Sequence, residues 1–505
     1  MGMPRLGQIL GVATLFLGGG GCTSVYPTVF ADRAPVTRAD DARPIPTPAP
    51  RKLVKEVYSA DVYVRRELVK AMDPRALPRA GDVNVVDLVP PSSWHHDDRT
   101  LDEYAPLGPP EPPWTIRLGA PSPSDRDDDS LVIVDRRGVP YELVYDRPRH
   151  PRRSTGSMAI ASRLVHALGY RTPEVHIIRD HQGRRAAAMQ WPVGVDLGPT
   201  PISERRDDDP NDRVPHGDRR TLRALHLAAA WLQLGRLPPQ MLRDAYVGSP
   251  GRGHVQHFVV GLQGALGVDH FDAALAFARD PDRENRNVFF RIFTLGLSPK
   301  PPSIPPETPF PSVGLFSSDI DLDAYRVSPP FEPRDRVRPD DQYWMAKQVE
   351  SMPHATIDAA LAAGRLDPGV TSWLRRRLER RRAEVVAWGF DRTTPCEVVS
   401  LSQRADGPTT VVIQDLGIRD GFVPPRERTY RWRVIDREGD EVVSERVTVA
   451  LGATTPIRIP ARALERDYLV VEVRAQRSKL DLPRPLEIHL RVSDNKRARL
   501  AAVQH

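Results

Sequence analysis

The stretch that decides the fold is Leu131–Asp180, which reads LVIVDRRGVPYELVYDRPRHPRRSTGSMAIASRLVHALGYRTPEVHIIRD. Two short apolar runs, Leu131–Val134 and Tyr141–Tyr145, lie on either side of a polar segment that contains Gly138. Short apolar runs separated by a glycine-containing turn are typical of a β-hairpin. The stretch is therefore predicted to open with two paired strands.

The second half of the stretch predicts a helix and a further strand. Apolar residues recur at helical spacing after Ser154 and Thr155, either of which can cap the helix, and Gly169 ends it. The apolar run Val175–Ile178 then returns as a strand. The predicted order is strand, strand, helix, strand. Many kinases build the lobe that covers their nucleotide from elements in this order.

Short segments inside and outside this stretch carry a resemblance to a known family. They are Ser92-Ser93-Trp94, Pro113-Trp114-Thr115, Tyr145-Asp146, Ser154-Thr155-Gly156, His166-Ala167-Leu168-Gly169-Tyr170, Pro173-Glu174, Trp231, His257 to Gly267, Pro311 to Phe316, and Asp341 to Phe390. The chain resembles an uncharacterised family of bacterial envelope lipoproteins that is distantly similar to atypical kinases of the spore-coat (CotH) and HipA type. The resemblance covers roughly residues 80 to 395 and implies a two-lobed, kinase-like unit.

The resemblance also shows where charged kinase groups are missing. Val144 stands where the phosphate-binding lysine is expected, and Arg152 where an acidic residue precedes the helix. Arg236 and Met241 replace the aspartate and asparagine of the catalytic loop, and Gly261 replaces the metal-binding aspartate. Phosphoryl transfer needs divalent metal held by carboxylates. We therefore expect a degenerate kinase with no catalytic residues, no metal and no cofactor, unless the fold is a different one.

Two acidic residues leave an active enzyme open as an alternative. Asp244 and Asp269 lie near the lost positions and could serve as displaced replacements in an ATP-dependent phosphotransferase, although solvated loop residues are the simpler interpretation. The adjacent His95 and His96 suggest a metal site, but neighbouring side chains on an extended chain point to opposite sides. A solvated loop is expected there.

Residues 1–21 have the layout of a lipoprotein signal peptide. Arg5 precedes the apolar run Ile9–Leu17, and four glycines then lead to Cys22. This predicts lipidation of Cys22 and a place in the cell envelope, either on the outer membrane or in the periplasm. Leu17 lies five positions before the cysteine, whereas a lipobox has leucine three before it, so plain secretion and an uncleaved anchor stay open.

Composition argues against a nucleic-acid partner. The 505 residues carry 72 basic and 66 acidic side chains, only seven of the basic ones are lysine, and the arginines are interleaved with acids. The densest basic block, Arg375–Arg382, lies in a helix with an apolar stripe, so its arginines are expected on the exposed face. Contact with an anionic surface, of lipid headgroups or lipopolysaccharide, is the alternative. Cys396 has no internal partner if Cys22 carries lipid.

The order of residue patterns along the chain predicts an α+β protein followed by a C-terminal all-β sandwich. After Pro395 the segments become short, β-branched and alternating, as in Thr409–Ile413 and Thr429–Ile435. The predicted parts are a signal peptide at 1–21, a proline-rich tether at 22–50, an N-terminal helical extension at 51–90, a kinase-like domain at 91–394 and the sandwich at 395–505.

These patterns predict a catalytically inactive, kinase-like lipoprotein that acts as a binding or scaffold protein in the cell envelope. We expect a protein or glycan partner, with the membrane reached through the lipid anchor. One alternative is the active phosphotransferase, and the other is a sandwich that binds alone while the rest of the chain is a spacer.

Overall fold

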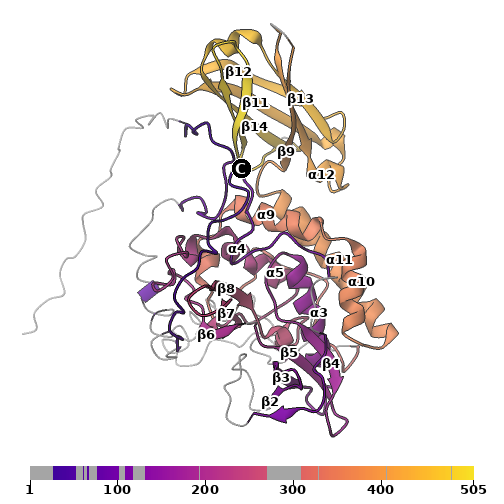
Figure 1. The fold of residues 1–505 in the computed structure, drawn as a ribbon. Helices are drawn as coiled ribbons and strands as arrows, with labels where there is room; N and C mark the ends of the chain where they lie inside the picture. Colours follow the sequence, from indigo (N-terminus) through magenta and orange to yellow (C-terminus); the bar gives the residue numbers. More distant parts are fainter. Residues whose placement is uncertain are drawn as a thin grey trace, which may run out of the picture.

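The computed structural model describes most of the chain after residue 26 (Figure 1). The described residues are 27–52, 58, 61, 65, 66, 77–101, 108–117, 131–192, 194–269, 309–327, 329–404, 407–478 and 480–505. The predicted signal peptide, Cys22 and residues 53–57, 59, 60, 62–64 and 67–76 of the predicted helical extension lie outside them. Residues 77–90, within the predicted helical extension, form turns and contain no helix.

The protein is α+β, and a five-stranded antiparallel sheet forms one end of it (Figure 1). The strand order is β1-β2-β3-β5-β4, and helix α3 connects β3 to β4. The bounds are β1 Thr115–Ile116, β2 Leu131–Val134, β3 Pro140–Tyr145, α3 Arg153–Ala167, β4 Val175–Arg179 and β5 Arg185–Gln190.

The predicted hairpin is confirmed, and its turn is built around a carboxylate. Strands β2 and β3 pair antiparallel, with Leu131 opposite Leu143. The Asp135 side chain accepts hydrogen bonds from the backbone N–H groups of Arg137 and Val139, both at 2.9 Å. Gly138 takes a left-handed conformation with φ 81°, which glycine adopts without steric cost.

Helix α3 is confirmed as well, but neither Ser154 nor Thr155 caps it. The helix begins at Arg153, so both residues lie inside its first turn. The Asp146 carboxylate accepts hydrogen bonds from the Thr155 N–H at 2.9 Å, the Thr155 hydroxyl at 2.7 Å and the Arg152 N–H at 2.8 Å. A carboxylate at a helix N-terminus satisfies free N–H groups and interacts favourably with the helix dipole, so Asp146 takes the capping role.

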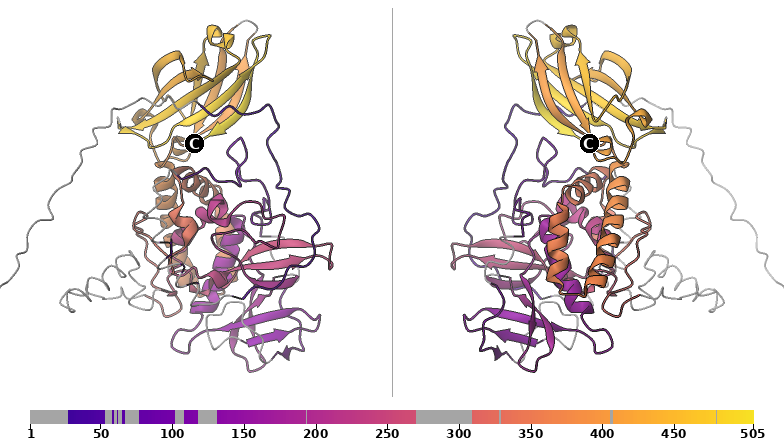
Figure 2. Two further views of the ribbon diagram at one scale, coloured as in Figure 1. Left: turned by 90° about the vertical axis from the view of Figure 1, so that its left-hand side faces the viewer. Right: turned by 90° about the vertical axis from the view of Figure 1, so that its right-hand side faces the viewer.

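The middle of the molecule combines a three-stranded sheet with the helices that form the largest core. Helices α9, α10 and α11 pack beside one another (Figure 2), and their apolar faces meet those of α3 and α5. The bounds are β6 Val195–Pro199, α4 Arg220–Arg223, α5 Leu225–Trp231, β7 Leu242–Val247, β8 His254–Val259, α8 Glu332–Asp335, α9 Pro339–Glu350, α10 His354–Ala363 and α11 Pro368–Phe390. No helix among the described residues is long and apolar enough to cross a membrane.

One arginine of α11 contradicts the prediction that its basic block faces solvent. Arg381 is buried, and its guanidinium donates hydrogen bonds to the carbonyl oxygens of Trp231 and Ser317, both at 2.8 Å, and of Ala230. A cation at the C-terminal end of a helix satisfies free carbonyls and the helix dipole, which explains its position at the end of α5. Burial lowers the pKa of Arg381 to about 10.

The proline-rich segment 27–50 is docked on the folded parts, in contrast to the predicted tether. Ile45 is 4% exposed, and its N–H donates to the Gly253 carbonyl at 2.9 Å. The Asp41 carboxylate accepts from the Ser93 N–H at 2.7 Å and from the Ser93 hydroxyl at 2.8 Å. Proline-rich composition does not reveal these contacts, because they depend on partners far away in the sequence.

Beyond α11 the chain forms two sheets that pack face to face around a second core (Figure 1). One sheet has the order β13-β10-β9, and the other has the order β12-β11-β14-β16-β17 with β15 beside β14. The bounds are β9 Cys396–Gln403, β10 Thr409–Asp415, α12 Leu416–Arg419, β11 Arg428–Asp436, β12 Glu441–Val449, β13 Thr454–Ile459, β14 Tyr468–Arg477, β15 Leu480–Asp481, β16 Leu486–Val492 and β17 Ala498–Gln504. Inward and outward residues alternate along β10 and β13, as in a sandwich. Cys396 is free and buried.

Candidate functional site

The structure brings Val144 and the segment before Gly261 together. Val144 on β3 is 7% exposed and belongs to one apolar cluster with Val260, which follows β8 and is fully buried. Phe258 packs against the same cluster. The other members are Met158, Ala159, Val175, Ile177, Ala187 and Met189. Hydrocarbon side chains therefore fill the contact between the five-stranded sheet and the strand that leads to Gly261.

The loop that follows α5 is also held by structural contacts. Met241 is fully buried in the main core, and its carbonyl accepts from the Val260 N–H at 2.8 Å. Gln233 donates from its side-chain amide to the Leu315 carbonyl at 2.7 Å and accepts from the Ser317 N–H at 2.8 Å. Sequence reasoning missed Gln233, because a lone glutamine carries no pattern.

Arg152 and Arg236 lie apart from this contact. Arg152 precedes α3 and forms an ion pair with Asp367, at the start of α11. Arg236 is exposed on the loop between α5 and β7. Gly261 is buried and left-handed, with φ 68°. Of the five positions, the structure groups Val144, Met241 and Gly261 around Val260 and leaves the two arginines outside.

Asp244 is not a solvated loop residue, because it lies on β7 with no exposed surface. Its carboxylate contacts His257 Nδ1 at 2.8 Å and the Arg206 guanidinium at 3.0 Å, and it accepts a hydrogen bond from the Thr200 hydroxyl. Burial by itself raises the pKa of Asp244, but His257, Thr200 and Arg206 outweigh it and hold the pKa below its usual value. The ionised carboxylate is thus occupied by partners of its own fold.

A second buried histidine extends this network. His216 Nε2 lies 2.7 Å from Asp212, which also accepts from Arg219 at 2.7 Å. The Trp94 ring stacks on His257 with centroids 4.0 Å apart and meets His216 edge-on at 4.9 Å. These residues come from separate segments without a recognisable spacing, so only the fold assembles them.

Asp269 and His95 also differ from a solvated loop. Asp269 is half-buried beside Gly264, where an added Cβ would lie 2.2 Å from the Asp269 carboxylate oxygens. His95 is buried, and burial lowers its pKa to about 3. Within the described residues no group of three or more histidine, cysteine, aspartate or glutamate side chains is arranged to hold a metal ion.

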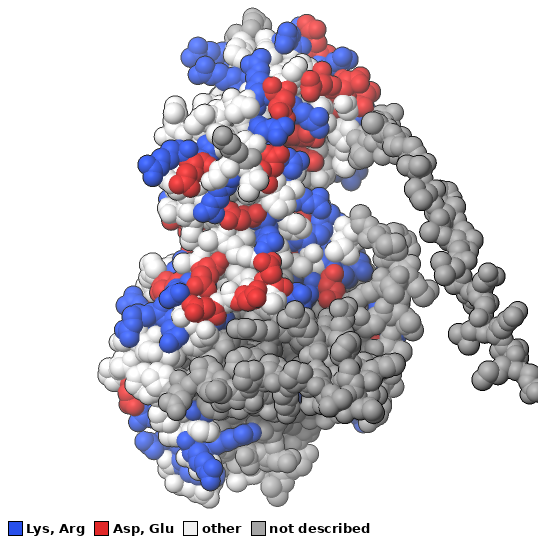
Figure 3. Space-filling view, turned by 180° about the vertical axis from the view of Figure 1, so that it is seen from behind, with Lys and Arg blue, Asp and Glu red and all other residues white. Residues whose placement is uncertain are grey.

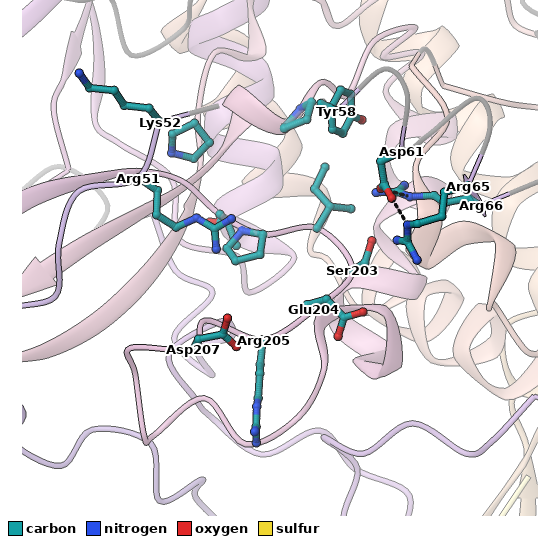
Figure 4. A pocket seen from close by; sticks show the side chains of 15 residues that line it. Arg51, Lys52, Tyr58, Asp61, Arg65, Arg66, Ser203, Glu204, Arg205 and Asp207 are labelled. Carbon is teal, nitrogen blue, oxygen red and sulfur yellow. Dashed lines mark hydrogen bonds and ion pairs between the residues drawn. The ribbon is translucent and has the colours of Figure 1, made fainter. Parts of the chain in front are cut away.

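A cavity of about 290 Å³ lies beside the β6 end and the segment that follows it (Figure 4). Arg51 and Lys52 stand on one side, and the ion-paired Asp61, Arg65 and Arg66 on the other. The remaining lining residues are Tyr58, Pro199, Thr200, Pro201, Ile202, Ser203, Glu204, Arg205, Asp207 and Pro239.

The polarity of this cavity suits a small anion better than an apolar ligand. Five of its lining side chains are basic and three are acidic. The Arg66 side chain is 9% exposed and contacts Asp61 at 2.8 Å and Glu332 at 3.0 Å, while its Nη1 has no hydrogen-bond partner in the described part of the chain. A buried guanidinium with a free N–H can donate to a carboxylate or phosphate oxygen.

Comparisons with known proteins give little. No protein-family model matches the sequence, and no curated protein matches it. Among solved structures the chain is similar to the Helicobacter pylori proinflammatory kinase CtkA, with a TM-score of 0.33 and 9% identity over 55% of this chain and 94% of that one. This is a weak, distant kinase-like likeness.

Proposed function

We propose that this protein is a kinase-like binding or scaffold protein of the bacterial cell envelope that does not transfer phosphate. The observation that carries the proposal is the burial of Val144 in one apolar cluster with Val260, because a nucleotide phosphate would require a cation and open space there. The antiparallel sheet with a helix between its third and fourth strands supports the kinase-like part.

The polar groups nearby support the same proposal. A kinase holds its magnesium ions with an aspartate and an asparagine that are open to the nucleotide. Met241 is buried in the core instead, and the carboxylate of Asp244 contacts Arg206, His257 and Thr200. Recruiting Asp244 as a displaced acid would remove the fully buried carboxylate from the Arg206 guanidinium and leave it with the half-exposed Asp208 as its ion-pair partner, at a cost of about 1–3 kcal/mol.

A nucleotide-binding experiment tests the proposal directly. Residues 23–505 would be melted with ATP, ADP or GTP in the presence of Mg²⁺ or Mn²⁺ and incubated with labelled ATP, beside an active kinase as positive control. We expect no metal-dependent shift in melting temperature and no phosphate transfer, because ligand that binds only the folded state must raise the melting temperature.

The opposite result would have a clear meaning. A nucleotide-and-metal-dependent shift of several degrees, or phosphate transfer that Asp269→Ala abolishes, would replace this proposal with an active phosphotransferase. Asp269→Asn is the matched variant, since it retains the size of the side chain while removing the charge that a metal requires.

The envelope location is tested separately at Cys22. We expect labelled palmitate to enter the wild-type chain and to be absent from Cys22→Ser, and the wild-type chain to sediment with membranes. The partner, a protein or a glycan, would be sought with residues 23–505. Retention of that partner by residues 396–505 alone would favour the alternative in which the sandwich binds and the rest is a spacer.

A further inference from the structure

A basic groove runs across one end of the C-terminal sandwich. It has a volume of about 1250 Å³ and lies between the β9–β10 turn, the segment between β13 and β14, and the β16–β17 turn. Its basic lining residues are Arg404, Arg462, Lys496, Arg497 and Arg499, and its acidic ones are Glu465 and Asp494. The groove therefore carries a positive excess.

Three of these guanidiniums have no ion-pair partner among the described residues. Within the described residues the side chains of Arg404, Arg462 and Arg497 are exposed and form no ion pair or hydrogen bond. Other surface arginines are matched by acids, as on α11, where Arg375 pairs with Asp358 at 2.9 Å. Figure 3 shows the same intermixing of Lys and Arg with Asp and Glu over the face it displays.

The chemistry of the groove selects oxyanions. A guanidinium presents a planar fork of N–H donors that fits a phosphate or carboxylate, and it remains charged at any physiological pH. No aromatic side chain is among the described residues that line the groove, so bases have no platform on which to stack. Several phosphate groups fit a groove of this volume and charge.

The N-terminal segment docks at the same end of the sandwich. Asp32 pairs with Arg499 at 2.6 Å, the Phe30 N–H donates to the Tyr468 hydroxyl at 3.0 Å, and the Phe30 carbonyl accepts from Arg491. Pro27 is five residues after Cys22, and five residues span at most about 17 Å. A lipid on Cys22 would thus hold this end of the sandwich within reach of the bilayer surface.

We propose that the groove binds the phosphate headgroups of an anionic membrane surface and orients the lipid-anchored protein on it. The inference rests on the proposed envelope anchoring, because the short link from Cys22 to Pro27 selects lipid over a soluble anion. The lipid would hold the chain at the bilayer, and a basic patch beside it adds an electrostatic attraction to anionic lipids that selects which face of the protein meets the surface.

The test uses the chain without its lipid, so that the groove is measured alone. Residues 23–505 are sedimented with vesicles of phosphatidylcholine, or of phosphatidylcholine mixed equally with phosphatidylglycerol. We expect binding to the mixed vesicles only, weakened by salt, and lowered about 100-fold by R404A/R462A/R497A, since each basic residue at an anionic surface contributes roughly fivefold. The control R147A/R252A/R376A removes three exposed arginines outside the sandwich and matches the change in net charge.

Each outcome decides the question. Equal losses in the two triple variants would show a general charge effect and overturn the groove. Binding to a soluble polyuronate but not to vesicles would overturn the membrane as occupant, and so would equal binding to both kinds of vesicle. Failure of Cys22 to take up palmitate would remove the anchoring of the proposed function, while the vesicle result would still report on the groove itself.

Discussion

Replacing Val144 by lysine tests whether the apolar cluster that contains Val144 and Val260 is tightly packed or open to water. Val144 is 7% exposed and surrounded by apolar side chains. A lysine confined there loses its hydration, and buried lysines reach pKa values of about 5–6, against about 10.4 in an unfolded chain. At pH 7 we expect Val144→Lys to be less stable by about 4–5 kcal/mol from this effect alone.

The pH dependence of the free energy of unfolding distinguishes the cost of burying a charge from the cost of overpacking. Val144→Met is the matched control, because it has a similar length without charge and carries only the overpacking cost of about 1–3 kcal/mol. The folded pKa of the introduced lysine lies below its unfolded pKa, so the unfolded state binds more protons between them and the stability of Val144→Lys rises with pH. The two variants should converge near pH 10.

Urea denaturation followed by tryptophan fluorescence at several pH values from neutral to about 10 measures the difference between the variants. Groups that titrate equally in both proteins cancel in this difference. The packing interpretation would be refuted if Val144→Lys matched Val144→Met at pH 7, and above all if Val144→Lys also gained a nucleotide-dependent rise in melting temperature. That result would place an open, hydrated cleft beside β3.

Three further predictions concern buried polar groups. Asp244→Ala should lower the free energy of unfolding by about 1–3 kcal/mol in urea denaturation, because it removes the buried acceptor shared by Thr200, His257 and Arg206, while Asp208 still pairs with Arg206; a loss below about 0.5 kcal/mol would contradict its role in the network. Arg381→Ala should cost about 2–4 kcal/mol by freeing buried carbonyls, and Arg381→Lys should recover only part of it, since one ammonium cannot replace the planar fork. His95 and His226 both have a pKa that burial lowers to about 3, so their neutral forms stabilise the fold above pH 6.5 and this stability is lost as pH falls. His166, whose pKa burial lowers to about 4, adds to this loss, and Asp341, whose pKa burial raises to about 6, offsets part of it. The net loss at pH 5.5 is about 3 kcal/mol, visible as a lower melting temperature than at pH 8 and contradicted by an unchanged one.

Local patterns predicted the elements whose neighbours along the chain decide their structure. The hairpin of β2 and β3 and the helix α3 follow from apolar spacing and from the turn at Gly138. The alternation after Pro395 likewise predicted short strands. In each case the pattern records which residues face a core, and that information is local because strands and helices have fixed periods.

Long-range partners decided the positions that local patterns misplaced. Asp146 displaced Ser154 and Thr155 as the cap of α3, although it lies beyond the usual capping distance in sequence. Arg381 lies in a basic run that resembles a solvated face, yet it is buried because it donates hydrogen bonds to the free carbonyls at the end of α5. The partners in these contacts are separated by between nine and 150 residues.

By itself the sequence determined the α+β class, the order of the early elements and the absence of charged side chains at Val144, Met241 and Gly261. Only the tertiary structure decided what those absences mean physically, because packing depends on which chain segments meet. The tertiary structure places Val144 in one buried apolar cluster with Val260, and it surrounds Asp244 with polar partners such as Arg206. The sequence specifies the identity of each side chain, whereas its solvation and its partners depend on which distant segments the fold brings together.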